Sequence, residues 1–339
     1  MAWKRHGIVI GRTSSGPGSG VVGDPCIVWD ETVQAWRMVY FCWPPGHAQA
    51  VATRRDLLSP DCRWETQGPL LFSNPEALLG GGTHKPWVVM DPFAPNQASR
   101  VDGRYCLLTV SSVDGHKVVQ RAWASALAGP WELEPGALIG LGAQGAFDEK
   151  HVDAVTGYYF PGRQEFLYFY MGYPLMAQDG AISPYGSAQA VATQRLGEEV
   201  VTKQGVILPP CQTAGHWASG WVGGLQLLPG KTHRWIGLIN ASPTAPNPTD
   251  SSEAREEPAP SLGGFAFCDE DWPIRGWSFM PDPIEWIEEI PEEARRTGES
   301  TNLWRQHIVA LDGGGGALFY NSGYYGQEQL YLKSTEALP

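Results

Sequence analysis

The chain has 339 residues and a formal net charge of −12, with only 24 lysine and arginine residues. Because phosphate contacts need clustered basic side chains, this balance argues against a nucleic-acid partner. The 41 glycines, 28 prolines and 15 tryptophans are typical of many short strands joined by tight turns.

A pattern of strand, turn and strand recurs in chain order, with the alternation and aromatic enrichment of half-buried strands. The first repeat comprises CIVWDETVQAWRMVYFCW, AQAVATRRDLL and RWETQGPLLF. The second comprises KPWVVMD, RYCLLTVSS and VVQRAWASALAGPWELEPGALI. The third comprises AVTGYYF, QEFLYFYMGY, AQAVATQRL and TKQGVIL, in which AVATQRLG echoes AVATRRDL of the first.

The fourth repeat comprises WVGGLQLL, HRWIGLINA, GGFAFCDED and WSFMPDPIEWI. In the fifth, HIVALDGGGGALFYNSGYY and QLYLKSTEAL supply three strands, and KRHGIVIG from the N-terminus supplies the outermost strand. Two excursions interrupt the pattern. Residues 243–263 form a Pro/Ser/Glu-rich surface segment, and residues 283–300 contain a short helix predicted to begin near Pro291.

One polar residue heads an apolar run in each repeat, and these residues are 60 to 91 positions apart. They are Asp24, His84, Asp153, His216 and His307. The segment after His307 and the segment before Asp24 together have about the length of one interval, which completes the fifth repeat. The spacing therefore predicts a single domain over residues 1–339, an all-β five-bladed β-propeller closed by strand exchange between the N- and C-termini. A β-sandwich with long loops is the alternative.

Three segments resemble the five-bladed glycoside hydrolases, the superfamily of family 43 arabinanases and β-xylosidases, invertases, levanases and anhydrogalactosidases. They are GDPCIVWDETVQAWRMVYF, HVDAVTGYYF and RQHIVALDGGGGALFY. The resemblance spans nearly the whole chain. It implies that Asp24 is the general base or nucleophile and that Asp153 tunes the pKa of the acid. Against this, Asp24 suits a turn before a strand, and Asp148 and Glu149 are rivals of Asp153.

The proton donor departs from that superfamily, whose fourth blade usually carries a glutamic acid. Here His216 occupies the corresponding position, which resembles the anhydrogalactosidase branch, and Asp153 would raise its pKa. Glu299 is the alternative donor. The plainer explanations are a histidine hydrogen-bonded within a Trp-rich turn and an exposed charge at a helix end.

Other side chains near the axis are candidates for substrate binding. His84 and Lys85 would form a cationic wall for a carboxylate or hydroxyls, or Lys85 would pair with an axial aspartate. Indole rings stack on sugar faces, although most of the tryptophans are expected in the core. The stacking candidates are Trp43, Trp87, Trp217, Trp221 and Trp304.

His307 matches an arabinanase histidine that contacts a water-shelled cation, so the resemblance implies calcium at the axis. A buried core histidine is the alternative, and the sequence shows no cluster of oxygen ligands around it. No cofactor is otherwise expected.

The resulting hypothesis is a hydrolase of a short oligosaccharide or glycoside, since inner strands of different blades would bring an acid and a base to one axial funnel. The alternatives are a propeller that binds carbohydrate without cleaving it, and a lyase or cyclase using the same Asp and His. The partner is a small carbohydrate, and the sequence leaves the oligomeric state open.

No segment reaches the length of a membrane span, and the first residues lack the apolar core of a signal peptide. The six cysteines stand singly, as expected of buried thiols in a reducing compartment. A cytoplasmic protein is therefore expected, or a secreted one if a leader has been removed.

Overall fold

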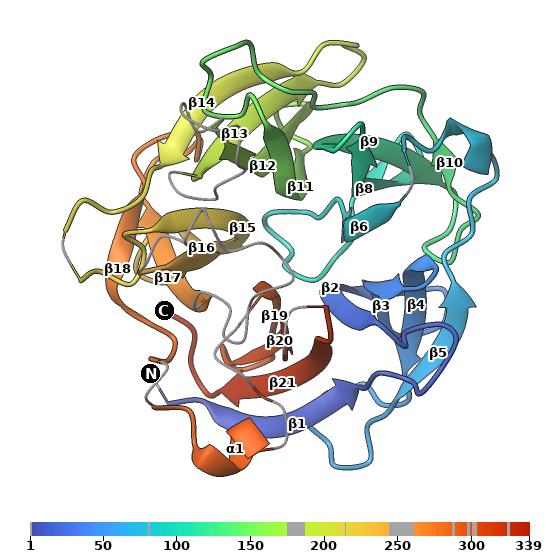
Figure 1. The fold of residues 1–339 in the computed structure, drawn as a ribbon, viewed down its shortest axis with the longest axis vertical. Helices are drawn as coiled ribbons and strands as arrows, with labels where there is room; N and C mark the ends of the chain where they lie inside the picture. Colours follow the sequence, from blue (N-terminus) through green and yellow to red (C-terminus); the bar gives the residue numbers. More distant parts are fainter. Residues whose placement is uncertain are drawn as a thin grey trace.

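The computed structural model describes residues 2–80, 82–174, 187–213, 215–243, 261–286, 289–296, 299, 304–323 and 326–339. The described strands form four hydrogen-bonded sheets, which Figure 1 shows arranged around a common centre. Short helices accompany them, among them η1 (Pro75–Ala77) and α1 (Glu292–Arg296). Helix α1 is the short helix predicted near Pro291. Most of the predicted excursion at 243–263 lies outside the described residues.

Three of the sheets have four antiparallel strands each, and we number them as groups in chain order. Group 1 contains β2 (Val21–Asp30), β3 (Ala35–Trp43), β4 (Gly46–Ala52) and β5 (Trp64–Pro69). Group 4 contains β15 (Trp221–Pro229), β16 (Trp235–Ser242), β17 (Leu262–Cys268) and β18 (Ser278–Pro283). Group 5 contains β19 (Trp304–Ala310), β20 (Gly316–Ser322), β21 (Gln329–Thr335) and β1 (Lys4–Ile10).

The fourth sheet has nine strands and divides into two groups, which a single parallel pair, His151 with Lys117, joins between β9 and β11. Group 2 contains β6 (Thr83–Val88), β7 (Arg100–Val101), β8 (Arg104–Val113), β9 (His116–Ala124) and β10 (Glu132–Leu133). Group 3 contains β11 (His151–Phe160), β12 (Glu165–Tyr173), β13 (Ala188–Arg195) and β14 (Thr202–Leu208).

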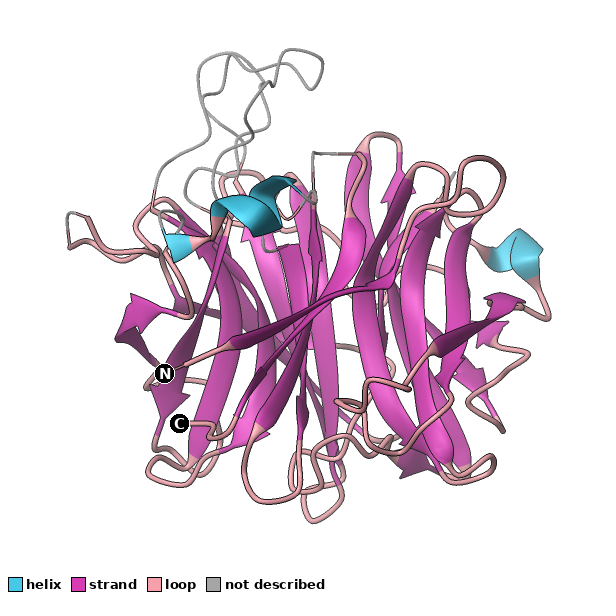
Figure 2. Cartoon of the chain, turned by 90° about the horizontal axis from the view of Figure 1, so that it is seen from below, coloured by secondary structure: helices cyan, strands magenta, loops and turns pink. Residues whose placement is uncertain are grey.

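The first strands of the five groups form a closed ring at the centre of Figure 1. Strand β2 contacts β6, β6 contacts β11, β11 contacts β15, β15 contacts β19, and β19 contacts β2. Strand β1 pairs antiparallel with β21 and is the outermost strand of group 5, as predicted for KRHGIVIG. Figure 2 shows long strands side by side, with loops at both ends of the molecule. The expectation of an all-β, propeller-like fold is confirmed.

Apolar side chains fill the spaces between neighbouring groups. Large aromatic residues such as Trp87, Tyr158 and Phe169 are completely buried and in ring contact with one another. Each such side chain contributes about 1.5–3 kcal/mol through its burial. All six cysteines are free thiols, four of them buried. Within the described residues, no helix is long and apolar enough to cross a membrane.

Each innermost strand carries a β-bulge near its start, where the pairing register with the neighbouring strand shifts. One residue in every bulge has a positive φ angle. These residues are Asp24 (50°), Lys85 (54°), Ala154 (49°), Gly224 (73°) and Arg305 (36°). The five positions are thus equivalent around the ring. Because a β-bulge changes the direction of the side chains around it, these five residues determine which side chains point toward the axis at the start of the innermost strands.

Candidate active site

Three of the five bulge positions carry charged side chains that gather at one place. Asp24 interacts electrostatically with Lys85 and Arg305, and the Arg305 guanidinium donates a 2.8 Å hydrogen bond to the carbonyl oxygen of Ala154. A β-carbon added to Gly224 would lie 3.6 Å from Nη1 of Arg305 and 3.8 Å from Cβ of Ala154. Side chains of groups 1, 2 and 5 therefore meet beside the small residues of groups 3 and 4.

The ring of polar residues expected from the sequence needs correction, because only Asp24 occupies a bulge position. In groups 2 and 3, His84 and Asp153 each stand one residue before the bulge residue. In group 5, His307 stands two residues after it. In group 4, His216 precedes the inner strand altogether, and the bulge is made by glycine.

Asp153 is completely buried and is held by two lysines. Lys85 Nζ donates to both carboxylate oxygens at 2.7 Å, and Lys117 Nζ donates to Oδ2 at 2.7 Å. Burial alone would raise the pKa of Asp153, but Lys117 and Lys85 hold it well below its usual range. Asp153 is therefore an ionised anchor for two cations. It has no proton to give at neutral pH.

Asp24 has a different environment. Burial raises its pKa, while Lys85 and Arg305 oppose that rise and Asp153 adds to it. Its carboxylate also accepts a hydrogen bond from the backbone N–H of Lys85, and its own N–H donates to Oδ1 of Asn321 at 3.3 Å. A buried carboxylate whose pKa is raised by its surroundings is typical of acid–base sites.

Two cations of this site, Lys117 and Arg305, were not among the residues expected from the sequence. Lys117 is the second residue of β9, and its Nζ reaches Asp153 from group 2. Arg305 stands two residues before His307 in RQHIVAL. This motif therefore contributes to the site through Arg305 rather than through His307. We call Asp24, Lys85, Lys117, Asp153 and Arg305 the axial cluster.

His84 lies next to the axial cluster but does not form a cationic wall with Lys85. Its Nε2 is 3.8 Å from Oδ1 of Asp153. Burial first, and then Lys117 and Lys85, hold the pKa of His84 well below its usual value, so the ring is neutral at pH 7. Lys85 follows the alternative expectation, since it pairs with an axial aspartate.

The structure does not bring His216 to the axial cluster. Its ring lies 5.4 Å from that of Phe279 in β18, the outermost strand of group 4, and Nδ1 accepts a hydrogen bond from Ala218 N–H. Burial lowers its pKa, and the carboxylate that opposes this is Asp282. The expectation that Asp153 raises the pKa of His216 is wrong.

Glu299 is buried in a separate ionic cluster rather than exposed at a helix end. Its Oε1 accepts hydrogen bonds from Tyr320 Oη at 2.6 Å and Arg5 Nε at 3.3 Å, and lies 3.2 Å from Lys333 Nζ. These partners belong to β20, β1 and β21 of group 5. Through these contacts the Glu299 carboxylate links the three strands.

The tryptophans expected to stack on sugars fall into distinct environments. Trp87 and Trp217 are fully buried, and their indole N–H groups donate to backbone carbonyls. Trp221 is buried beside Ala154 of the group 3 bulge. Trp43 is 47% exposed at the end of β3, and a β-carbon on Gly82, just before β6, would lie 3.9 Å from its ring. The side chain of Trp304 lies outside the described part of the structure.

His307 is buried in the axial core, with its ring 5.2 Å from that of Trp87. Burial lowers its pKa to about 3, so the imidazole is neutral. Among the described residues, no three His, Cys, Asp or Glu side chains come together as metal ligands. This donor set does not fit the implied calcium ion, and we derive no step through a cation.

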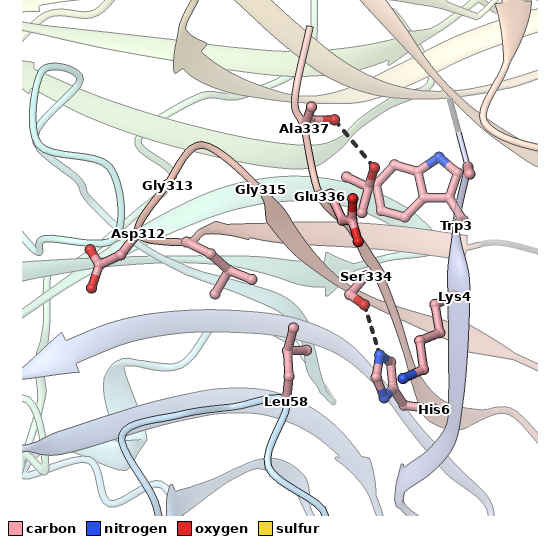
Figure 3. A pocket seen from close by; sticks show the side chains of 13 residues that line it. Trp3, Lys4, His6, Leu58, Asp312, Gly313, Gly315, Ser334, Glu336 and Ala337 are labelled. Carbon is pink, nitrogen blue, oxygen red and sulfur yellow. Dashed lines mark hydrogen bonds between the residues drawn. The ribbon is translucent and has the colours of Figure 1, made fainter.

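A cavity of about 750 Å³ lies away from the axial cluster, beside the paired terminal strands. Figure 3 shows it between Trp3, Lys4 and His6 of the N-terminal segment and Ser334 and Glu336 near the C-terminus. His6 Nε2 is hydrogen-bonded to Ser334 Oγ at 2.7 Å. None of the candidate residues lines this cavity. Because acid and base groups must reach the reacting atoms, the candidate active site is the axial cluster.

No protein-family model matches the chain, and no curated protein matches it. Solved structures do. One described as "Glycoside hydrolase" matches with a TM-score of 0.70 and 13% identity over 98% of this chain and 92% of that one. A thermostable family-43 glycoside hydrolase matches with a TM-score of 0.63 and 12% identity over 96% and 89% of the two chains.

A third structure comes from work on the GH130 family of mannoside phosphorylases, which contains glycoside hydrolases that target β-1,2 mannosidic linkages. It matches with a TM-score of 0.60 and 12% identity over 100% of this chain and 96% of that one. At such low identity these likenesses establish the fold, and the reaction has to be argued from the residues. The chain thus has the propeller-type fold of these solved glycoside hydrolase structures.

Proposed function

We propose that the chain is a five-bladed propeller, with each strand group as one blade and the β1–β21 pair closing the ring. We propose further that it is a glycoside hydrolase acting on a short oligosaccharide or glycoside at the axial cluster. The observation that carries the proposal is the meeting of Asp24 with Lys85, Arg305 and Asp153 at the bulges. Charged groups held on rigid strands in a buried setting are suited to acid–base catalysis.

In the proposed reaction Asp24 is the general base. It takes a proton from a water molecule, whose oxygen then bonds to the anomeric carbon as the glycosidic bond breaks. Asp153 acts through the lysines that it holds. With Asp153 ionised, Lys85 and Lys117 stay fixed, and the ammonium group of Lys85 is placed to orient a sugar hydroxyl group.

A binding protein without hydrolytic activity is the second candidate. The observation that favours it is the fourth inner strand, where Gly223 and Gly224 occupy the bulge and supply no acid. The two candidates differ in one measurable respect, because only a hydrolase releases a new reducing end from a bound sugar.

The test is a panel of aryl glycosides and oligosaccharides, with binding followed by calorimetry and products by mass spectrometry. Hydrolysis in ¹⁸O-labelled water is expected to place one labelled oxygen in the product. Binding without product would identify a carbohydrate-binding protein. A product that lacks the elements of water would identify a lyase or cyclase.

Trp43 provides a separate prediction. If its exposed ring stacks on a sugar at the entrance to the site, Trp43→Ala should raise KM about tenfold, as expected for a loss of roughly 1.4 kcal/mol. The kcat value should change much less, since an indole ring stacked on a sugar takes no part in proton transfer. Steady-state kinetics with the best panel substrate measures this. Trp36→Phe, at the other end of β3, is the control and should leave KM unchanged.

A further inference from the structure

Glu328 lies beside the base Asp24 although the two are far apart in the sequence. It stands directly before β21, and its carbonyl oxygen accepts a 3.0 Å hydrogen bond from the N–H of Val22, two residues before Asp24. Asn321, opposite Leu330 in the neighbouring strand, contacts the backbone of Asp24. The segment that enters β21 is thereby held against the start of β2.

The Glu328 side chain is enclosed at this junction. The residue is 6% exposed, and no described group lies within hydrogen-bonding distance of its buried Oε2. Burying a carboxylate without a partner for each oxygen favours the neutral acid. Burial raises the pKa of Glu328 to about 7, and Asp24 adds to the rise, while the backbone N–H groups of Gly326, Gln327 and Glu328 oppose it.

The Asp24 and Glu328 carboxyl groups differ in the neighbouring groups that most influence their pKa. Asp24 has Lys85 and Arg305 to stabilise its charge, whereas the main influences on the pKa of Glu328 are burial, Asp24 and backbone N–H groups. When one proton is available to such a pair, it resides on the group whose charge is less stabilised. Glu328 is therefore placed to carry a proton below about pH 7, while Lys85 and Arg305 favour the carboxylate form of Asp24.

We propose that Glu328 is the proton donor of the axial site. This inference rests on the proposed glycosidase function and adds the acid that the fourth group lacks. The Glu328 proton passes to the glycosidic oxygen as the bond to the anomeric carbon breaks, and the bonding electrons leave with that oxygen. Water, deprotonated by Asp24, forms the new bond to carbon. Glu328 then regains a proton from solvent, and Asp24 releases one.

The test is Glu328→Gln, which keeps the size of the side chain and removes the acid. Turnover of a glycoside with an alkyl leaving group should fall ~10²–10⁴-fold, the usual contribution of general acid catalysis. Turnover of a 2,4-dinitrophenyl glycoside should be nearly unchanged, because that leaving group needs no proton. The alkaline limb of the kcat/KM profile, near the pKa of about 7, should disappear. Glu336→Gln, an exposed carboxyl beyond β21, is the control.

Equal losses on both leaving groups, or an unchanged pH profile, would overturn the assignment. The same selective effect in His216→Gln instead would assign the proton to the other candidate. Infrared difference spectra of wild type against Glu328→Gln give a readout independent of turnover. A protonated-carboxyl band is expected at about pH 5 and should be lost above the pKa. If no glycoside is cleaved but this band is present, the proposed function fails while the buried acid stands. An absent band overturns the inference itself.

Discussion

Asp24→Asn is expected to lower turnover by ~10²–10⁴-fold while leaving the melting temperature nearly unchanged. The amide keeps the shape of the side chain but cannot accept a proton from water. Stability should survive because burial raises the pKa of Asp24 in the folded protein. A group with a raised folded pKa binds its proton more tightly in the native state, so its ionisation at neutral pH destabilises the fold. An uncharged amide removes that penalty.

Turnover by steady-state kinetics and melting by calorimetry test this prediction, with Asp312→Asn in an exposed turn as the control. A variant that is fully active would remove Asp24 from the mechanism. A variant that is unfolded would assign Asp24 a structural role, such as fixing the bulge.

Unlike Asp24→Asn, the Asp153→Asn variant is expected to lose stability as well as activity. The buried carboxylate accepts 2.7 Å hydrogen bonds from Lys85 and Lys117. Removing one partner of a buried ion pair costs about 3–5 kcal/mol, since the remaining charge is left uncompensated. Denaturant unfolding of the variant should show this loss. Combining it with Lys117→Met should recover part of the lost stability, because one of the two cations left without the Asp153 carboxylate is removed.

The stability difference between wild type and Asp153→Asn should depend on pH, because the pKa of Asp153 is lowered in the folded protein. The lysines hold the folded pKa of Asp153 well below its usual value, so its stabilisation is present above the unfolded pKa, about 3.9. That stabilisation disappears as pH falls toward the folded pKa. The difference in unfolding free energy between wild type and Asp153→Asn should thus be constant near neutral pH and shrink in acid. A difference that does not depend on pH would contradict the ionised anchor.

Repeat spacing predicted the propeller-like fold because each repeat is a local pattern of strands and turns. The position of Asp24 was also accessible, since it heads the apolar run that follows it in GDPCIVW. A second local signal was overlooked: Pro25 and Pro86 follow Asp24 and Lys85, at the same step after each bulge residue. Aligning GDPC with HKPW on the proline would have selected Lys85 rather than His84 as the equivalent residue.

The identity of the proton donor could not be predicted from local sequence motifs. His216 and Glu299 were chosen by their order along the chain, yet their partners come from the outer strand β18 and from the ionic cluster of group 5. Glu328 heads no motif and is brought to Asp24 by the contact between Val22 and the start of β21. Such placement depends on how the first and last groups meet, which local sequence patterns do not encode.

The central claim, that a glycosidic bond is cleaved at the axial cluster, is tested most directly by a crystal structure. The Asp24→Asn variant would be crystallised with the panel glycoside that the wild type cleaves. The account predicts the scissile bond beside position 24, with Glu328 within hydrogen-bonding distance of the glycosidic oxygen. A glycoside bound away from the axial cluster, for example in the cavity beside Trp3 and His6, would contradict it.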